Sequence, residues 1–154
     1  MTNLHASALV LDGKGVIIFG PSGTGKTALA LELVRSALRD GMTANLVADD
    51  RVNVENRDGR LVASAPPALK GLVEIRGSGI HAVPHADMAT LDLAVELVRE
   101  ADAERIAPLA PRLVAEAIAL PVLVLPMRQL DGAVRAILSH LGLYFPLSGR
   151  LNPD

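Results

Sequence analysis

The chain has 154 residues, half of them apolar, and this is the size of a single globular domain with one core. It contains no cysteine, which excludes disulfides and thiolate metal sites and is compatible with the reducing cytoplasm where we expect the protein. A formal net charge of −2, no basic run and only 2% aromatic residues exclude nucleic acid as the main partner, because phosphate backbones require a concentrated basic face.

The N-terminal segment predicts a β-hairpin. Residues 1–5 lack the basic start and apolar core of a secretory signal. Residues 6–11 are rich in β-forming side chains, and Asp12-Gly13 provides the turn into an apolar strand at residues 16–19. The second strand is therefore expected to pair antiparallel with its predecessor.

The next segment fits the phosphate-binding pattern GxxxxGK[ST] without a mismatch. It lies between the strand at 16–19 and a helix expected at 27–39, where apolar residues recur at helical spacing. The glycines let backbone N–H groups surround an anion, Lys26 reaches the outer phosphates, and the hydroxyl of Thr27 is available to Mg²⁺. The alternative is a helix cap that binds nothing, and the complete match favours nucleotide binding. The predicted nucleotide-binding residues are Gly20, Pro21, Ser22, Gly23, Thr24, Gly25, Lys26 and Thr27.

Two carboxylates follow the next predicted strand. Residues 45–48 are short and apolar, and Asp49 and Asp50 come directly after them, at the strand end where α/β sheets bind ligands. One carboxylate can hold Mg²⁺ or its waters while the other takes the proton of an attacking hydroxyl. The pair could instead cap a turn, but its position one helix after the loop favours the functional interpretation.

The middle of the chain predicts a second hairpin and a binding loop. Residues 51–55 and 60–64 flank a turn, which indicates a solvent-facing hairpin. A short strand then opens into a loop at 70–80 with three glycines, Glu74 and Arg76. These two charges could neutralise one another as a surface pair. The glycines, which let a ligand approach the backbone, favour a binding role.

The following segments predict two strands separated by a loop. Residues 91–98 alternate like a half-buried strand, and residues 101–112 are charged and indicate a surface loop. Pro121 and Pro126 restrict residues 118–125 to an edge or irregular strand. This apolar stretch is too short to span a bilayer, so we expect no membrane association.

The C-terminal segment predicts a helix and a tail. Residues 131–143 show helical spacing of apolar residues, with Asp131 as the expected N-cap. Residues 144–154 contain prolines and a glycine and are expected to be extended or mobile. The sequence shows no internal repeat and no domain boundary.

Taken together, the ordered motifs resemble the HPr kinase/phosphorylase family, bacterial enzymes that act on a seryl hydroxyl of the phosphocarrier protein HPr. The resemblance is carried by His5-Ala6-Ser7 and by residues 20–27, 46–52 and 74–80. The last segment is the most specific, because many unrelated families share the phosphate-binding loop. Beyond residue 80, only Glu104-Arg105 and the strand-then-helix ending can be placed.

The resemblance implies roles for particular side chains. The implied catalytic residues are His5, Lys26, Asp50 and Arg105, and the implied metal ligands are Thr27 and Glu74, to which the Asp pair adds Asp49. Asp50 would accept the proton of the target serine. Composition alone would leave His5 a solvated N-terminal side chain, so the resemblance reverses that interpretation. The surroundings of Arg105 have diverged from the family pattern.

The resemblance also implies a fold and a setting. The fold is α/β, a P-loop-containing mixed sheet with flanking helices, similar to the phosphoenolpyruvate carboxykinase nucleotide-binding core. Residues 1–154 are expected to form a single P-loop kinase catalytic domain. ATP and Mg²⁺ are the implied cofactors, and members usually assemble as homohexamers.

The sequence departs from the family pattern in three places. Full-length members carry an additional N-terminal domain, whereas this chain begins almost at the catalytic domain, like the short forms of some proteobacteria. Thr27-Ala28 stands where Ser-Glu commonly follows the loop lysine. The segment associated with the dephosphorylating reaction is hard to recognise in residues 120–130, where 127–129 are its remnant. We therefore expect kinase activity more than phosphorylase activity.

The expected function is that of an ATP-dependent serine kinase acting on an HPr-like phosphocarrier of a regulatory phosphotransferase system. Two alternatives stay open on the same core, a small-molecule kinase and a non-catalytic nucleotide-sensing module. Phosphorylation of a metabolite without a protein acceptor would favour the first alternative. Nucleotide binding without turnover would favour the second.

Overall fold

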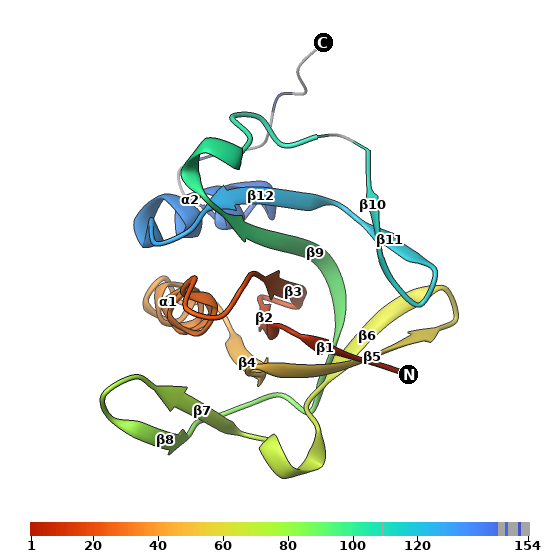
Figure 1. The fold of residues 1–154 in the computed structure, drawn as a ribbon, viewed down its shortest axis with the longest axis vertical. Helices are drawn as coiled ribbons and strands as arrows, with labels where there is room; N and C mark the ends of the chain where they lie inside the picture. Colours follow the sequence, from red (N-terminus) through yellow and green to blue (C-terminus); the bar gives the residue numbers. More distant parts are fainter. Residues whose placement is uncertain (109, 145–146, 148–150, 152–154) are drawn as a thin grey trace.

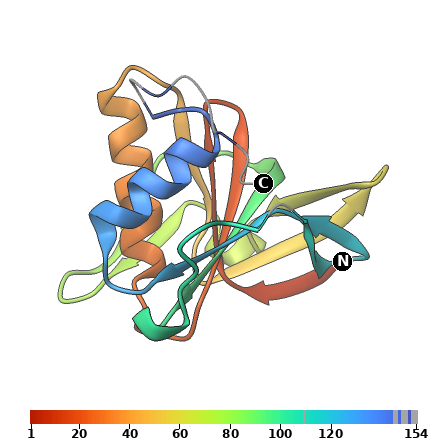
Figure 2. The ribbon, with the colours of Figure 1, turned by 90° about the horizontal axis from the view of Figure 1, so that it is seen from above.

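The computed structural model describes residues 1–108, 110–144, 147 and 151. Within them the chain forms a mixed, curled β-sheet with two helices against one of its faces (Figures 1 and 2). The helices are α1 (Lys26–Arg39) and α2 (Leu130–His140), and two short 3-10 turns cover Pro67–Leu69 and Glu100–Asp102. The strands are β1 (Thr2–His5), β2 (Ser7–Leu11), β3 (Lys14–Phe19), β4 (Ala44–Ala48), β5 (Arg51–Arg57), β6 (Arg60–Ser64), β7 (Leu72–Ile75), β8 (Gly79–Ala82), β9 (Met88–Val98), β10 (Arg112–Ala115), β11 (Ile118–Leu120) and β12 (Val122–Pro126).

The long strand β9 organises the main sheet, whose order is β1-β5-β6-β9-β3-β2-β4 with β12 as an additional partner of β9. β3 and β12 run parallel to β9, and the other neighbours in this sheet are antiparallel. The start of β9 pairs with β6 and its end pairs with β12, so two different strands share one of its edges. The sheet is therefore split where β6 and β12 diverge.

Strand alternation divides the core into two layers. Val16 and Ile18 of β3 face the helices, where they pack with Leu29 and Leu33 of α1, whereas Ile17 faces the opposite side. Within β9, Val95 is buried on the helix side and Ala94 on the other side. The alternation predicted at residues 91–98 is confirmed, since Leu91, Leu93, Val95 and Leu97 are buried while Asp92, Glu96 and Val98 are half-buried. Ala94 is the exception, because the other side of the sheet is also covered at this position.

The structure confirms the first predicted hairpin and the first predicted helix. β2 and β3 pair antiparallel, and both turn residues have positive φ, 49° at Asp12 and 79° at Gly13, as a tight two-residue turn requires. The helix expected at 27–39 is α1.

The expected hairpin at residues 51–64 forms and exposes its turn at residues 56–60, but the apolar residues of its strands are in the core. Val52 and Val54 of β5 and Leu61 of β6 are fully buried. The reason is tertiary, since β5 pairs with β1 and β6 pairs with β9. The N-terminal strand β1, for which the sequence predicted no strand, pairs with β5 at this edge of the sheet.

Other elements refine the sequence-based expectations. The glycine-rich segment forms a separate hairpin of β7 and β8 (Figure 1). Pro121 splits the irregular strand into β11 and β12. α2 begins after Gln129, so Asp131 lies in its first turn and the expectation that it caps the helix is wrong. In the predicted tail, residues 145–146, 148–150 and 152–154 lie outside the described residues.

Neither α1 nor α2 is long and apolar enough to cross a bilayer, and these are the α-helices of the part of the chain that the structure describes.

Candidate active site

The phosphate-binding loop, the Asp pair and the β7–β8 hairpin meet at one cavity of about 550 Å³. Most of the residues predicted for the site line it, although they come from four separate stretches of the sequence. The lining residues are His5, Ser22, Gly23, Gly25, Lys26, Thr27, Ala28, Leu31, Asp49, Asp50, Glu74, Ile75 and Arg76.

The loop between β3 and α1 has the conformation that its glycines permit. Gly23 and Gly25 have φ of 79° and 95°, a region that side chains disfavour. Gly25 is the N-cap of α1, and no side chain caps this helix end. The first N–H groups of α1 can therefore donate to an anion, which the positive end of the helix dipole also attracts.

Lys26 is held against the loop by two backbone carbonyls. Its Nζ donates to Gly20 O at 2.7 Å and to Pro21 O at 3.1 Å, and the residue is buried. Burial lowers the pKa of the ammonium below its ordinary value, and the negative charges of Asp50 and Asp49 act in the opposite direction. The cation is thus desolvated next to the anion cradle, where its attraction to a phosphate is least screened by water.

Asp49 is buried and accepts two hydrogen bonds on a single oxygen. Its Oδ1 receives the hydroxyl of Ser7 at 2.9 Å and the hydroxyl of Thr27 at 2.7 Å. These side chains join the end of β4, the start of β2 and the start of α1. Since the Thr27 hydroxyl donates to Asp49, its oxygen lone pairs can face a cation. Ser7 was given no role from the sequence, although it belongs to the His5-Ala6-Ser7 segment that carries the family resemblance.

Ser7→Ala should lower the free energy of unfolding by about 1.5 kcal/mol, because Asp49 would lose one of two hydrogen bonds to a charged group. Urea denaturation followed by circular dichroism measures this change. Ser64→Ala, the same substitution at a half-buried position of β6, is the matched control and should leave stability close to that of the parent. Equal midpoints for the two variants would contradict the role assigned to Ser7.

Asp50 is turned away from the strand and toward solvent. Its φ of 67° lies in the left-handed region, and the N–H of Arg51 donates to Asp49 O at 2.8 Å across this tight turn. Its side chain is 69% exposed and lies 3.0 Å from His5 Nε2. An ionised carboxylate can only accept, so the hydrogen bond to Asp50 Oδ1 comes from Nε2–H of His5. The pairing of β1 with β5 sets this contact, since His5 lies opposite Arg51.

The β7–β8 hairpin brings Glu74 and Arg76 to the cavity. Val73 is buried in the core beneath α1, so its neighbour Glu74 lies on the exposed side of the strand. In the part of the chain that the structure describes, no ion pair joins Glu74 to Arg76. Both charges are therefore available to a ligand, as the glycine-punctuated loop indicated.

The oxygen donors at this cavity fit Mg²⁺. Asp49 and Thr27 are in contact, and Glu74 lines the same cavity. The described residues contain no cluster of three His, Cys, Asp or Glu side chains that would hold a metal by itself. A site with few protein ligands suits Mg²⁺, which keeps several waters and takes further oxygens from substrate phosphates.

Arg105 is not brought to this cavity. It lies in the loop after β9 and lines a different cavity, with Ile106, Leu123 and Ala136. Its implied catalytic role therefore stays a prediction, because within one chain Arg105 does not line the cavity that contains Lys26 and Asp50.

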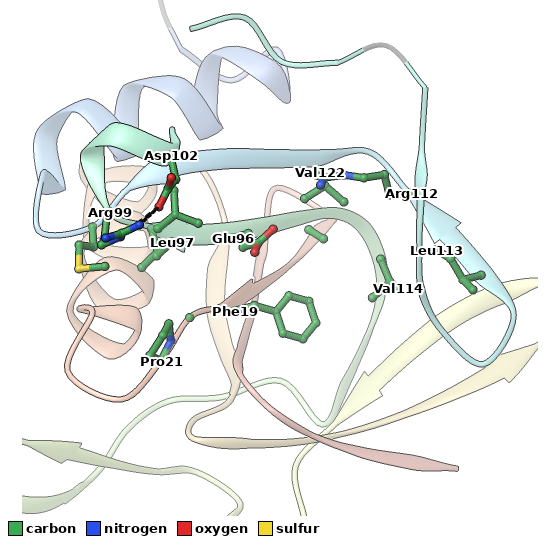
Figure 3. Close-up of a pocket in the computed structure, with 14 residues that line it drawn as sticks. Phe19, Pro21, Glu96, Leu97, Arg99, Asp102, Arg112, Leu113, Val114 and Val122 are labelled. Carbon is green, nitrogen blue, oxygen red and sulfur yellow. Dashed lines mark hydrogen bonds and ion pairs between the residues drawn. The ribbon is translucent and has the colours of Figure 1, made fainter. Parts of the chain in front are cut away.

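A second cavity of about 620 Å³ lies where β12 and the β10–β11 hairpin diverge from the main sheet (Figure 3). Phe19 and Glu96 line it, and Arg99 and Asp102 form an ion pair at 3.0 Å beside it (Figure 3). It is larger than the cavity at the phosphate-binding loop, yet it contains none of the predicted catalytic or metal-binding side chains. Chemistry rather than size therefore identifies the candidate active site.

Comparisons with known proteins point in the same direction. Residues 1–112 match the family model described as HPr Serine kinase C-terminal domain. The HPr kinase/phosphorylase of Limosilactobacillus reuteri is 51% identical over 79 residues, which are 51% of this chain and 23% of that protein. The HPr kinase/phosphorylase of Clostridium tetani is 41% identical over 83 residues, 54% of this chain and 25% of that protein. Each match thus spans about a quarter of the relative's own length.

A solved structure is similar over most of its length. The Hpr(Ser) kinase/phosphatase from Coxiella burnetii superposes with a TM-score of 0.72 at 26% sequence identity. The match covers 90% of this chain and 94% of that chain. The similarity therefore extends beyond the N-terminal half that the sequence motifs cover.

Proposed function

Because the chain belongs to the HPr serine kinase C-terminal domain family, we propose that it transfers a phosphoryl group from ATP to a seryl hydroxyl of an HPr-like phosphocarrier. Residues 1–154 act in this proposal as one P-loop kinase catalytic domain on a phosphoenolpyruvate carboxykinase-like nucleotide-binding core. The observation that carries it is the exposed carboxylate of Asp50, hydrogen-bonded by His5 at the mouth of the cavity that contains Lys26.

The proposed roles follow from the geometry of the cavity. Backbone N–H groups of the loop and the ammonium of Lys26 bind the phosphates of ATP. Thr27, Asp49 and Glu74 are the residues that would hold Mg²⁺. When bound, this ion supplies positive charge that neutralises the negative charge developing on the phosphate oxygens.

The transfer step moves one proton and replaces one bond to phosphorus by another. The carboxylate of Asp50 accepts the proton of the seryl hydroxyl, and the seryl oxygen forms a bond to the γ-phosphorus. The bond between that phosphorus and the bridging oxygen breaks, and ADP leaves with the bonding electrons. His5 keeps the Asp50 carboxylate in place through its Nε2–H.

A protein acceptor fits the exposure of the base better than a metabolite does. The side chain of Asp50 is 69% exposed, so a seryl hydroxyl on a protein surface can reach it. Ile80 is 71% exposed and lies opposite Glu74 in the β7–β8 hairpin, which provides an apolar contact beside the site. A kinase for a small molecule would be expected to enclose its acceptor and exclude water.

The proposed setting is the cytoplasm, and the proposed assembly is a homohexamer. Arg105 is proposed as a further catalytic residue on the family resemblance alone. We propose the kinase reaction and not the reverse, phosphorylase reaction, because the segment associated with the latter is reduced to residues 127–129.

The test is incubation of the purified chain with ATP, Mg²⁺ and an HPr-like protein from the same organism. We expect phosphate on one serine of the carrier, identified by mass spectrometry. A carrier with that serine changed to alanine is the control and should take up no phosphate. Phosphorylation of a metabolite without a carrier, or ATP binding without transfer to any carrier, would contradict the proposal.

A further inference from the structure

A narrow apolar cavity lies beside the phosphate-binding loop and is not used by the chemistry above. It measures about 200 Å³ and separates the start of α1 from the connection between β12 and α2. We call it the apolar slot, and its lining residues are Thr24, Gly25, Ala28, Leu29, Leu97, Pro126, Arg128, Gln129, Leu130 and Ala133.

The apolar slot adjoins the phosphate cavity. Gly25 and Ala28, at the start of α1, line both. A ligand whose anionic end lies on the loop can thus extend past these two small residues into the slot. Both residues are small, so they present little side-chain bulk between the two cavities.

The walls of the slot suit a flat, uncharged ring. Leu97, Pro126 and Leu130 contribute apolar surface, and the hydroxyl of Thr24 is already used, since it donates to Pro21 O at 2.7 Å. A heteroaromatic ring gains from leaving water for such walls without requiring a particular pattern of hydrogen bonds.

Arg128 connects the slot to the loop. Its Nη2 donates to Gly23 O at 3.2 Å, across 105 positions of sequence. Its φ of 60° lies in the left-handed region, which residues other than glycine, asparagine and aspartate rarely adopt. Strained residues of this kind concentrate at ligand-binding sites. The planar guanidinium is also a group on which bases stack.

We propose that the apolar slot holds the base of the bound nucleotide and that the guanidinium of Arg128 covers it. The inference rests on the proposed function, because it requires a nucleotide on the loop. The triphosphate lies on the loop N–H groups, the ribose passes Gly25 and Ala28, and the base enters between α1 and α2. Because the walls offer few hydrogen-bonding groups, the slot selects purines by stacking area and discriminates weakly between adenine and guanine.

Isothermal titration calorimetry with MgATP and with inorganic triphosphate separates the two parts of the ligand. Ala133→Leu fills the slot from α2 and should weaken MgATP binding by about tenfold or more, leaving triphosphate affinity unchanged. Ala136→Leu, the same substitution on the same helix outside the slot, is the matched control and should leave both affinities unchanged.

A second variant keeps the inference testable if Ala133→Leu does not fold. Arg128→Gly suits the left-handed backbone and should be folded, with weakened MgATP binding and unchanged triphosphate binding. If the parent binds triphosphate as tightly as MgATP, or if filling the slot weakens both equally, the slot is not the base site and the proposed function still stands. Binding of neither compound would overturn both.

Discussion

Asp50→Asn should lower the rate of phosphoryl transfer by about a thousandfold and leave ATP affinity unchanged, because an amide cannot take the proton of the acceptor hydroxyl. The substitution is close to neutral for the fold. Asparagine tolerates the left-handed backbone found at this position, where φ is 67°. Its amide oxygen can still accept the hydrogen bond from His5, which spans 3.0 Å in the parent. Single-turnover transfer from radiolabelled ATP measures the rate, and calorimetry measures the affinity.

Asp12→Asn is the matched control for this experiment. Asp12 also has a left-handed backbone, with φ of 49°, but it lies in the β2–β3 turn and lines neither of the two cavities at the loop. This variant should transfer phosphate at the parent rate. An Asp50→Asn protein that is equally active would remove Asp50 from the mechanism.

Gly15→Ala should lower the free energy of unfolding by about 3 kcal/mol, because the added methyl group has no room. A Cβ at this position would lie 2.0 Å from Thr90 O and 2.8 Å from Thr90 C. Both are backbone atoms of β9, the strand that pairs with β3. The N–H of Gly15 also donates to Asp92 Oδ2 at 3.0 Å, so a shift of β3 would cost this bond as well. Urea denaturation measures the change.

Gly132→Ala is the control with the opposite expected sign. Gly132 lies in α2, and an added Cβ there meets nothing within 4 Å. Alanine should raise stability by about 0.5 to 1 kcal/mol, through its helix propensity and a smaller entropy of the unfolded chain. A Gly15→Ala protein as stable as the parent would contradict the close approach of β3 and β9.

The two cavities at the loop divide the proposed ligand by chemistry. The phosphate cavity contains Lys26 and the carboxylates that would surround a metal, whereas the apolar slot is lined largely by aliphatic side chains. The shared residues Gly25 and Ala28 are small. Variants in one cavity should thus change the response to triphosphate, and variants in the other should change only the response to the base.

Features that depend on residues close together in the chain were predictable from the sequence. The loop at 20–27, the turn at Asp12-Gly13 and the helix after the loop are specified by short-range sterics and local hydrogen bonds, and the structure contains all three features. The family was also recognisable, since its motifs are contiguous, and the match over residues 1–112 confirms it. The α/β class with a mixed sheet and flanking helices was predictable because strand and helix periods are local patterns, and the structure confirms it.

The contacts between side chains that are distant in the chain were not predictable from the sequence. His5 reaches Asp50 across 45 positions, and Ser7 reaches Asp49 across 42, both through strand pairing whose register no local pattern specifies. The place of β5 and β6 in the main sheet likewise buries Val52, Val54 and Leu61 of a hairpin that the sequence assigned to the surface. Arg105 lies apart from the site and Arg128 lies against the loop, although from the sequence both are arginines in loops. Such contacts depend on long-range packing, which composition and spacing do not encode one residue at a time.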